Sequence, residues 1–291
     1  MQISKKVVFN NNLRLVVIGL ILILGILFYW FYKSYLTNPE MVFYGMISNN
    51  LNTRNYVIVN NQEELGGNLI QETLVNSGAK NVVSSIETTN IISSKALIQT
   101  LSVGTPNTDY STYQKIDVGK TSSVYKPIIG VWGVNSPNGS NGQGGQLYKS
   151  TILSPFLFSS PSIRQTSTLM NFIRANKVYT IQSSRFTTVD GRQAINYQIS
   201  INTKQYTKLL GLYLSIIGYK NQKQAIEYNG TQTVELDVSV DIFSRQLIAL
   251  SYVGSSSVEV YESYGINSSV KLPPKAIPLQ VLKDQIVSLS K

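Results

Sequence analysis

The pattern of apolar residues over positions 177–253 changes from alternating to helical and back, and this change most restricts how the chain folds. Over residues 195–201 every second side chain is apolar, which is the period of a half-buried strand. Asp190 and Gly191 lie just upstream and suit the positive φ angles of a tight turn, so residues 179–189 should pair with this strand. The sequence therefore predicts a β-hairpin.

A helix and a second hairpin follow this first one. From Tyr206 to Ile217 apolar residues recur at intervals of three and four, and Gly218 is suited to end the helix. Alternation resumes over residues 234–240, and a turn near Ser244 returns the chain. Each hairpin has one apolar face and the helix has one apolar stripe, so a sheet wrapped over the helix buries all three. We predict an α+β fold, in which a curved antiparallel sheet (half a β-barrel) wraps over helices.

The chain contains neither cysteine nor histidine. Disulfides and lipid attachment through cysteine are therefore excluded, as are zinc fingers, Cys-His nucleophilic pairs, Ser-His-Asp triads and histidine-ligated haem. Ser268 and Lys271 have the spacing of a serine-lysine acylase, but the supporting motifs are missing. Asp237 and Asp241 lie on the polar face of a predicted strand, where solvation accounts for them. We expect no catalytic residue, no metal and no cofactor.

An uncharged, leucine- and isoleucine-rich run occupies residues 15–32 and ends in aromatic residues. As a helix it spans about 27 Å, close to the roughly 30 Å hydrocarbon thickness of a bilayer. The aromatic cluster and Lys33 suit the membrane interface. A cleaved signal peptide is the alternative, but no A-x-A-like site follows the run.

Basic residues set the expected topology of this anchor, because Lys5, Lys6 and Arg14 precede it. The N-terminus is then cytoplasmic and the rest of the chain lies outside the cell membrane, as in a single-pass protein. The net charge of +10 is otherwise scattered, so we predict no nucleic-acid partner. The expected divisions are a cytoplasmic N-terminus (1–14), a transmembrane anchor (15–35), an extracytoplasmic half-barrel domain (37–275) and a C-terminal tail helix (276–291).

Weaker sequence signals predict the remaining helices, strands and loop. Asn38 and Pro39 favour the start of a helix that ends near Asn50. A helix over residues 161–176 should point Ile163, Leu169, Met170, Phe172 and Ile173 mostly inward. The remaining strands are predicted at 56–59, 86–92, 96–103, 124–134 and 258–264, and a glycine-rich loop at 135–146.

Several segments resemble one known family. They are INYQISINT, KQYTKLLGLYLSIIG, VELDVSVDIFSRQLIALSY and the closing YESYGINSSVKLPPKA. Together they are similar to the LolA/LppX-like superfamily of bacterial cell-envelope lipoprotein carriers and lipid-binding lipoproteins. The family's aspartate-arginine-leucine hairpin matches Asp241, Arg245 and Leu247. The resemblance covers most of residues 37–280 and is best from about 160 onward.

This resemblance implies a half-open β-barrel with helices on its concave face and an apolar cavity for acyl chains between them. It brings no catalytic residue. The chain departs from the family by its transmembrane helix, which suits a protein that receives, presents or senses a ligand at the membrane better than a shuttle. On this basis the expected ligand-binding residues are Tyr206, Leu209, Leu210, Tyr213 and Leu214 on the helix, and Ile199, Leu236 and Val238 on the sheet.

Two functions stay open at this stage. Tyrosines such as Tyr197, Tyr206, Tyr213 and Tyr252 should lie on inner faces, where they either fill a core or line a pocket for an apolar ligand or lipid. A cavity of several hundred Å³, gated by the loop at 135–146, favours lipid binding. A filled core with an exposed aromatic patch favours a non-enzymatic interaction module with a protein partner in the envelope.

Overall fold

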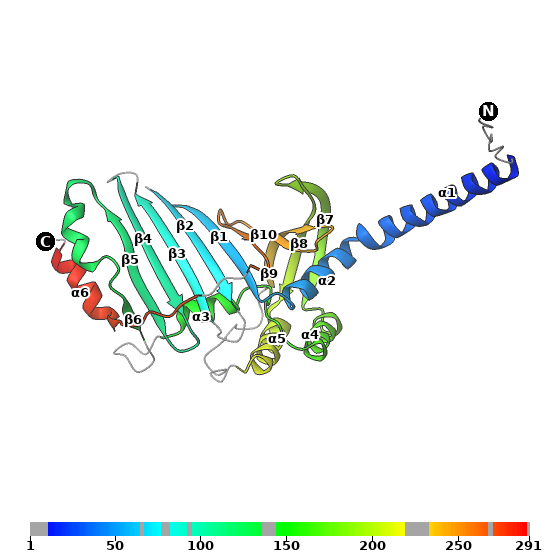
Figure 1. The fold of residues 1–291 in the computed structure, drawn as a ribbon. Helices are drawn as coiled ribbons and strands as arrows, with labels where there is room; N and C mark the ends of the chain where they lie inside the picture. The colour runs from blue at the N-terminus through cyan, green and yellow to red at the C-terminus, as the bar shows by residue number, and fades with distance from the viewer. Residues whose placement is uncertain are drawn as a thin grey trace, which may run out of the picture.

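The computed structural model describes residues 11–64, 67–76, 82–91, 95–135, 144–218, 233–266 and 270–289. They form an α+β fold built on a single curved, open sheet of twelve strands, which confirms the predicted fold class (Figure 1). The order across the sheet is β12-β6-β5-β4-β3-β2-β1-β11-β10-β9-β8-β7. Neighbouring strands are antiparallel except for β12 and β6, which are parallel.

The strands form two runs of the chain that meet in the middle of the sheet. The first run is β1 (Asn55–Glu64), β2 (Gly67–Asn76), β3 (Val82–Ile91), β4 (Ala96–Gly104), β5 (Asp109–Asp117) and β6 (Gly133–Asn135). The second is β7 (Tyr179–Val189), β8 (Arg192–Asn202), β9 (Thr233–Asp241), β10 (Leu247–Tyr252) and β11 (Val258–Glu262), with β12 (Ile277–Pro278) at the far edge. Strand β11 joins the two runs because it pairs with both β10 and β1.

The predicted hairpins are present. Asp190 and Gly191 have φ angles of 49° and 76° and connect β7 to β8, as a tight two-residue turn requires. Strand β8 also pairs with β9 across the helix α5 (Thr203–Ile216) that separates them in sequence. Gly218, with φ 73°, follows the end of α5.

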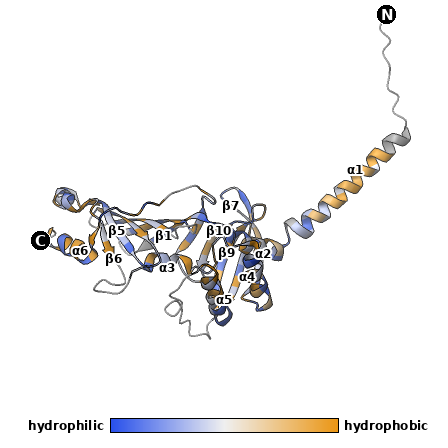
Figure 2. Ribbon diagram, turned by 60° about the horizontal axis from the view of Figure 1, so that its bottom comes forward, coloured by the Kyte–Doolittle hydropathy of each residue, from blue (hydrophilic) through white to orange (hydrophobic). Residues whose placement is uncertain are grey.

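The N-terminal helix α1 (Asn11–Phe31) stands away from the rest of the molecule (Figure 1). It is apolar along most of its length (Figure 2), and the segment Val16–Tyr35 is long and apolar enough to cross a membrane. None of that segment is buried by the rest of the protein. One turn of π-helix, η1 (Tyr32–Leu36), leads from α1 toward α2 (Pro39–Asn50). The Asn38 side chain caps α2 by accepting from the N–H groups of Glu40 and Met41.

One face of the sheet, here called the inner face, is covered by helices and carries the core. The covering helices are α2, α3 (Gln146–Ile152), α4 (Ile163–Ala175) and α5. The apolar segment 153–158 lies between α3 and α4, and Phe156, Leu157 and Phe158 within it are buried. At the far edge, α6 (Leu279–Leu289) packs on β6 and on the 3₁₀ helix η2 (Gly119–Ile128). The opposite face of the sheet is called the outer face.

The structure corrects several expectations. Residues 124–134 are not a strand: they comprise the end of η2, a connection and the short β6, and Pro127 lacks the N–H that a central strand donates. Ile163, at the first turn of α4, is 86% exposed instead of inward, because the helix begins at the Ser162 cap, ahead of the buried Leu169 and Ile173. Tyr252, at the end of β10, lies on the inner face as predicted, where it borders a cavity described below, but it is 45% exposed.

Candidate functional site

Arg245 links the folded domain to the segment that follows the apolar helix α1. The guanidinium carbon of Arg245, in the turn between β9 and β10, lies 4.8 Å from the centre of the Tyr35 ring. A Cβ placed on Gly45 of α2 would lie 2.5 Å from Cδ of Arg245, so any larger residue at this position would displace the Arg245 side chain. Asn49 Nδ2 donates to the carbonyl oxygens of Ser244 and Arg245 at 2.9 and 3.2 Å. The turn therefore packs along α2 and reaches η1, at the end of α1.

Asp241 holds this turn in shape. It is only 7% exposed, and its Oδ1 accepts from the N–H groups of Phe243 and Ser244 at 2.9 and 2.8 Å. The expectation of a solvated Asp241 was wrong because the carboxylate turns back onto the backbone. Arg245 then adopts a φ of 53°, and Leu247 returns to the core with no exposed surface. The aspartate-arginine-leucine pattern thus has a structural role in this chain.

The eight residues expected to bind a ligand all belong to the packed core. Tyr206 is 4% exposed, Val238 2%, and the other six 1% or less. Val238 borders a groove on the outer face, and the other seven border neither of the two cavities described below. Their part in ligand binding stays a prediction.

Three buried tyrosines hold the segment 153–158 in place. The Tyr206 hydroxyl donates to the carbonyl of Ser154, the Tyr179 hydroxyl to Pro155 at 2.8 Å, and the Tyr213 hydroxyl to Phe158 at 2.7 Å. Burial raises the pKa of Tyr179 and of Tyr213, so both hydroxyls stay protonated donors. The polar ends of these tyrosines therefore satisfy backbone carbonyls of a segment that belongs to no strand or helix.

An inner cavity of about 240 Å³ lies between the sheet and α3. Its sheet wall comes from β1, β2, β10 and β11, and its other wall from α3 and residues 153–155. Ile58, Leu147, Leu153, Pro155 and Tyr252 give it an apolar part, and the polar part is Asn60, Gln71, Thr73, Ser150, Thr151, Ser154 and Glu259. Sequence reasoning missed this site because polar residues occupy its positions on β1 and β2.

Glu259 is the one acidic group in the lining of this inner cavity. Burial raises its pKa, and the Tyr261 hydroxyl, which donates to Oε2 at 2.7 Å, partly opposes that effect. A carboxyl group with a raised pKa at the wall of a small cavity is suited to accept a hydrogen bond or to share a proton with a ligand.

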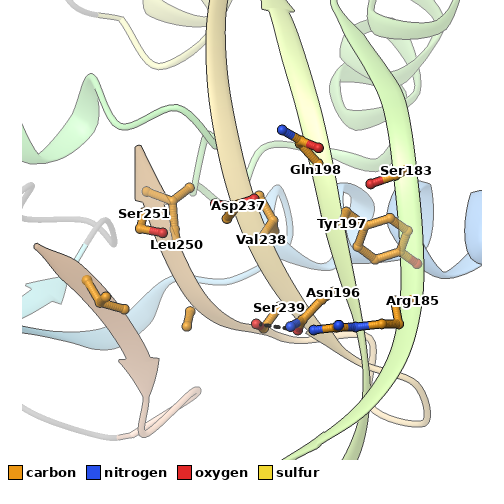
Figure 3. Close-up of a pocket in the computed structure, with 12 residues that line it drawn as sticks. Ser183, Arg185, Asn196, Tyr197, Gln198, Asp237, Val238, Ser239, Leu250 and Ser251 are labelled. Carbon is orange, nitrogen blue, oxygen red and sulfur yellow. Dashed lines mark hydrogen bonds between the residues drawn. The ribbon is translucent and has the colours of Figure 1, made fainter. Parts of the chain in front are cut away.

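A larger, open groove of about 540 Å³ lies on the outer face of β7 to β11. Seven of its lining residues have polar side chains, among them Arg185, Asn196, Gln198 and Asp237 (Figure 3). Ser239 Oγ donates to Asn196 Oδ1 at 2.8 Å. Among the described residues no cluster of acidic side chains could hold a metal ion. The predicted glycine-rich loop, over 136–143, and Ser268 lie outside the described residues.

Two solved structures are similar to the described fold at low sequence identity. No protein-family model and no curated protein sequence matches the chain. Among solved structures, LprF from Mycobacterium bovis is similar over 81% of this chain and 98% of its own, with 9% identity and a TM-score of 0.38. The Mycobacterium tuberculosis lipoprotein LppX is similar over 81% and 100%, with 10% identity and a TM-score of 0.37. At this level the likeness assigns no residue of this chain to a ligand.

Proposed function

We propose that this chain is a single-pass membrane protein whose extracytoplasmic domain binds a lipid or another amphipathic molecule in the inner cavity. It would act as a carrier, presenter or sensor at the cell envelope and not as an enzyme. The basic residues ahead of α1 favour a cytoplasmic N-terminus. The apolar, unburied Val16–Tyr35 segment supports the membrane anchor.

The observation that carries this proposal is the mixed lining of the inner cavity. Its apolar side chains suit a hydrocarbon chain, whereas Asn60, Gln71 and Glu259 are hydrogen-bonding groups for a polar head. Both the inner face of the sheet and the opposing α3 segment contribute apolar and polar groups. An amphipathic molecule between them would therefore contact protein on two sides. The outer groove has mainly polar side chains and lacks a second wall of helices.

The volume of the inner cavity limits how much of a ligand it can hold. Small-molecule sites are usually about 300–1,000 Å³, and this cavity measures about 240 Å³. It therefore accommodates part of an amphipathic molecule, the region where one chain meets the head group. The remainder would extend along the half-exposed inner face of β2 to β4, past Leu69, Thr89 and Ile98.

The Arg245 contact with the anchor bears on how such a ligand is used. Since the domain is fastened to the end of the membrane helix, it stays close to one membrane surface. A tethered domain is suited to exchange a ligand with that membrane or with a neighbouring envelope protein, and not to cross a compartment.

The packed core favours a second candidate function. The side chains predicted to line a pocket instead fill the space between α5 and the sheet. A filled domain on a membrane anchor would serve as an interaction module for a protein partner in the envelope. The two candidates differ in whether the folded protein retains a lipid.

Native mass spectrometry separates them. Residues 37–291 contain every described core residue, so this part can be secreted to a bacterial periplasm and purified without detergent. Lipid binding predicts a discrete added mass that organic solvent extracts. Ser150→Trp should remove that mass by filling the inner cavity, whereas Gln146→Trp, exposed on the same helix, should leave it. A clean apo mass that persists after incubation with envelope lipids would favour the interaction module.

A further inference from the structure

The outer groove is built on two rows of polar side chains that cross the strands. In the first row Arg185 of β7, Asn196 of β8 and Ser239 of β9 are direct neighbours in register. In the second row the corresponding neighbours are Ser183, Gln198, Asp237 and Ser251, the last of them on β10. All seven line the same groove, and Figure 3 shows Arg185 reaching across β8 toward Asn196 and Ser239.

Sheet geometry gives this array a definite size. Adjacent strands lie about 4.8 Å apart, and residues two apart on one strand lie about 7 Å apart. The four strands and two rows therefore present polar groups over an area of roughly 14 by 7 Å. Two or three linked sugar rings fit an area and a volume of this kind.

Most of these polar side chains have hydrogen-bonding groups that no other described side chain uses. Within the described part of the chain, Arg185, Gln198 and Asp237 make no hydrogen bond or ion pair with other side chains, and Asn196 keeps its amide N–H₂ free. Water solvates the polar face of any exposed strand, but solvation alone does not require that a guanidinium, two amides and a carboxylate share one groove. Their arrangement offers donors and acceptors at fixed spacing.

We propose that this groove binds a carbohydrate that carries one anionic group. Amide and carboxylate side chains match the donor and acceptor pairs of sugar hydroxyls, as Asn196, Gln198 and Asp237 would do. The Arg185 guanidinium matches a carboxylate or phosphate with two parallel hydrogen bonds. Asp237, in the other row and two strands away, disfavours a second anion at that end. The ligand would lie with its anionic group over β7 and its neutral sugars over β8 to β10.

Such chemistry occurs in free envelope glycans and in the head groups of glycolipids, and one experiment tells them apart. The full chain in phosphatidylcholine nanodiscs is titrated with a panel of trisaccharides that each carry one carboxylate or phosphate, sialyllactose among them, with lactose as neutral partner. Binding is measured by calorimetry and by saturation-transfer NMR. A second arm uses nanodiscs that contain a lipid with the sialyllactose head group and measures competition by the free sugar.

Variants of surface polar residues, Arg185 exposed and Gln198 and Arg192 half-buried, then locate the site. Arg185→Gln should weaken binding of an anionic sugar by about tenfold or more and leave lactose unchanged, because only the charged contact is lost. Gln198→Ala should weaken both. Arg192→Gln, on the same hairpin but outside the groove, is the matched control. The proposal is overturned if no sugar of the panel binds in either arm, or if Arg185→Gln and Arg192→Gln act alike. Ser150→Trp in the inner cavity should not affect sugar binding, so this site and the lipid site can fail separately.

Discussion

Arg245 packs its guanidinium 4.8 Å from the ring of Tyr35, across a space that Gly45 leaves open. This contact joins a turn of the sheet to the segment that follows the apolar helix α1, two parts that are far apart in the sequence. The turn itself is held by Asp241, so Asp241 and Arg245 together connect the hairpin to Tyr35.

Two glycines in helices, Gly45 and Gly211, test whether Arg245 occupies the space beside Gly45. Gly211→Ala in α5 adds a methyl group that meets nothing within 4 Å, so it should raise the free energy of unfolding by about 0.5–1 kcal/mol. Gly45→Ala should lack this gain because it displaces Arg245. In an Arg245→Ala background Gly45→Ala should recover it. Thermal unfolding of the four variants in nanodiscs measures the cycle, and equal gains for both glycines in the native background would contradict the packing of Arg245 beside Gly45.

The stability of the fold should depend more on the hydrogen-bond acceptor that Asp241 provides than on its charge. Asp241→Ala leaves two N–H groups of the turn without their partner and is expected to cost about 1–3 kcal/mol. Asp241→Asn keeps an oxygen acceptor and should cost less. Asp237→Ala, exposed on the same strand, is the control and should change stability by less than about 0.5 kcal/mol. Chemical denaturation gives all three values; equal costs for Ala and Asn would show that charge, and not the turn, matters.

The tyrosines that hold segment 153–158 give a third prediction. Tyr213→Phe removes the donor to the Phe158 carbonyl in a site with almost no solvent, and should destabilise the fold by about 1–2 kcal/mol. Tyr125→Phe, in the partly exposed η2, should have little effect. Because segment 153–155 forms one wall of the inner cavity, Tyr206→Phe should also increase hydrogen exchange of that segment and weaken lipid retention. Unchanged exchange would show that packing alone holds the wall.

The raised pKa of Glu259 predicts how the stability of the fold depends on pH. Its pKa is raised in the folded state, so over the interval between its unfolded and folded pKa values the native protein binds more protons than the unfolded chain. The stability contribution is therefore most favourable below the unfolded pKa and falls as pH rises through the folded one. Glu259→Gln should be more stable than the native chain at neutral pH, and this advantage should shrink on acidification. A melting temperature difference that is constant with pH would refute the assignment.

The periodic parts of the fold were predictable from the sequence, and the reason is physical. In β8, β9 and α5 the apolar side chains face one shared core, so apolar residues recur in the sequence with the period of the strand or helix. The start of α2 at Asn38 was similarly visible, because orphan N–H groups select specific residues, whereas the Ser162 cap of α4 was not predicted. Strands β2 and β5 were missed because their inner positions, such as Thr73 and Ser111, are polar and carry no such period.

The location of a cavity was not predictable in the same way. An apolar stripe such as Leu209 and Leu210 has the same sequence pattern whether it lines a pocket or fills a core, and here it fills one. The inner cavity instead arises where α3 approaches β1 and β2, which depends on how the whole twelve-stranded sheet curves. Asp241 was misjudged for a related reason, since alternation gives the face of a residue but not the turn that its carboxylate reaches.

Photo-crosslinking tests most directly where a lipid sits. Residues 37–291 are incubated with a fatty acid that carries a diazirine in its chain, irradiated, and mapped by peptide mass spectrometry. We expect the label to concentrate on peptides containing Ile58, Leu153 and Tyr252, and we expect Ser150→Trp to remove it while Gln146→Trp does not. Label confined to the α5 peptide around Leu209 and Leu210, or label that Ser150→Trp leaves unchanged, would contradict binding in the inner cavity.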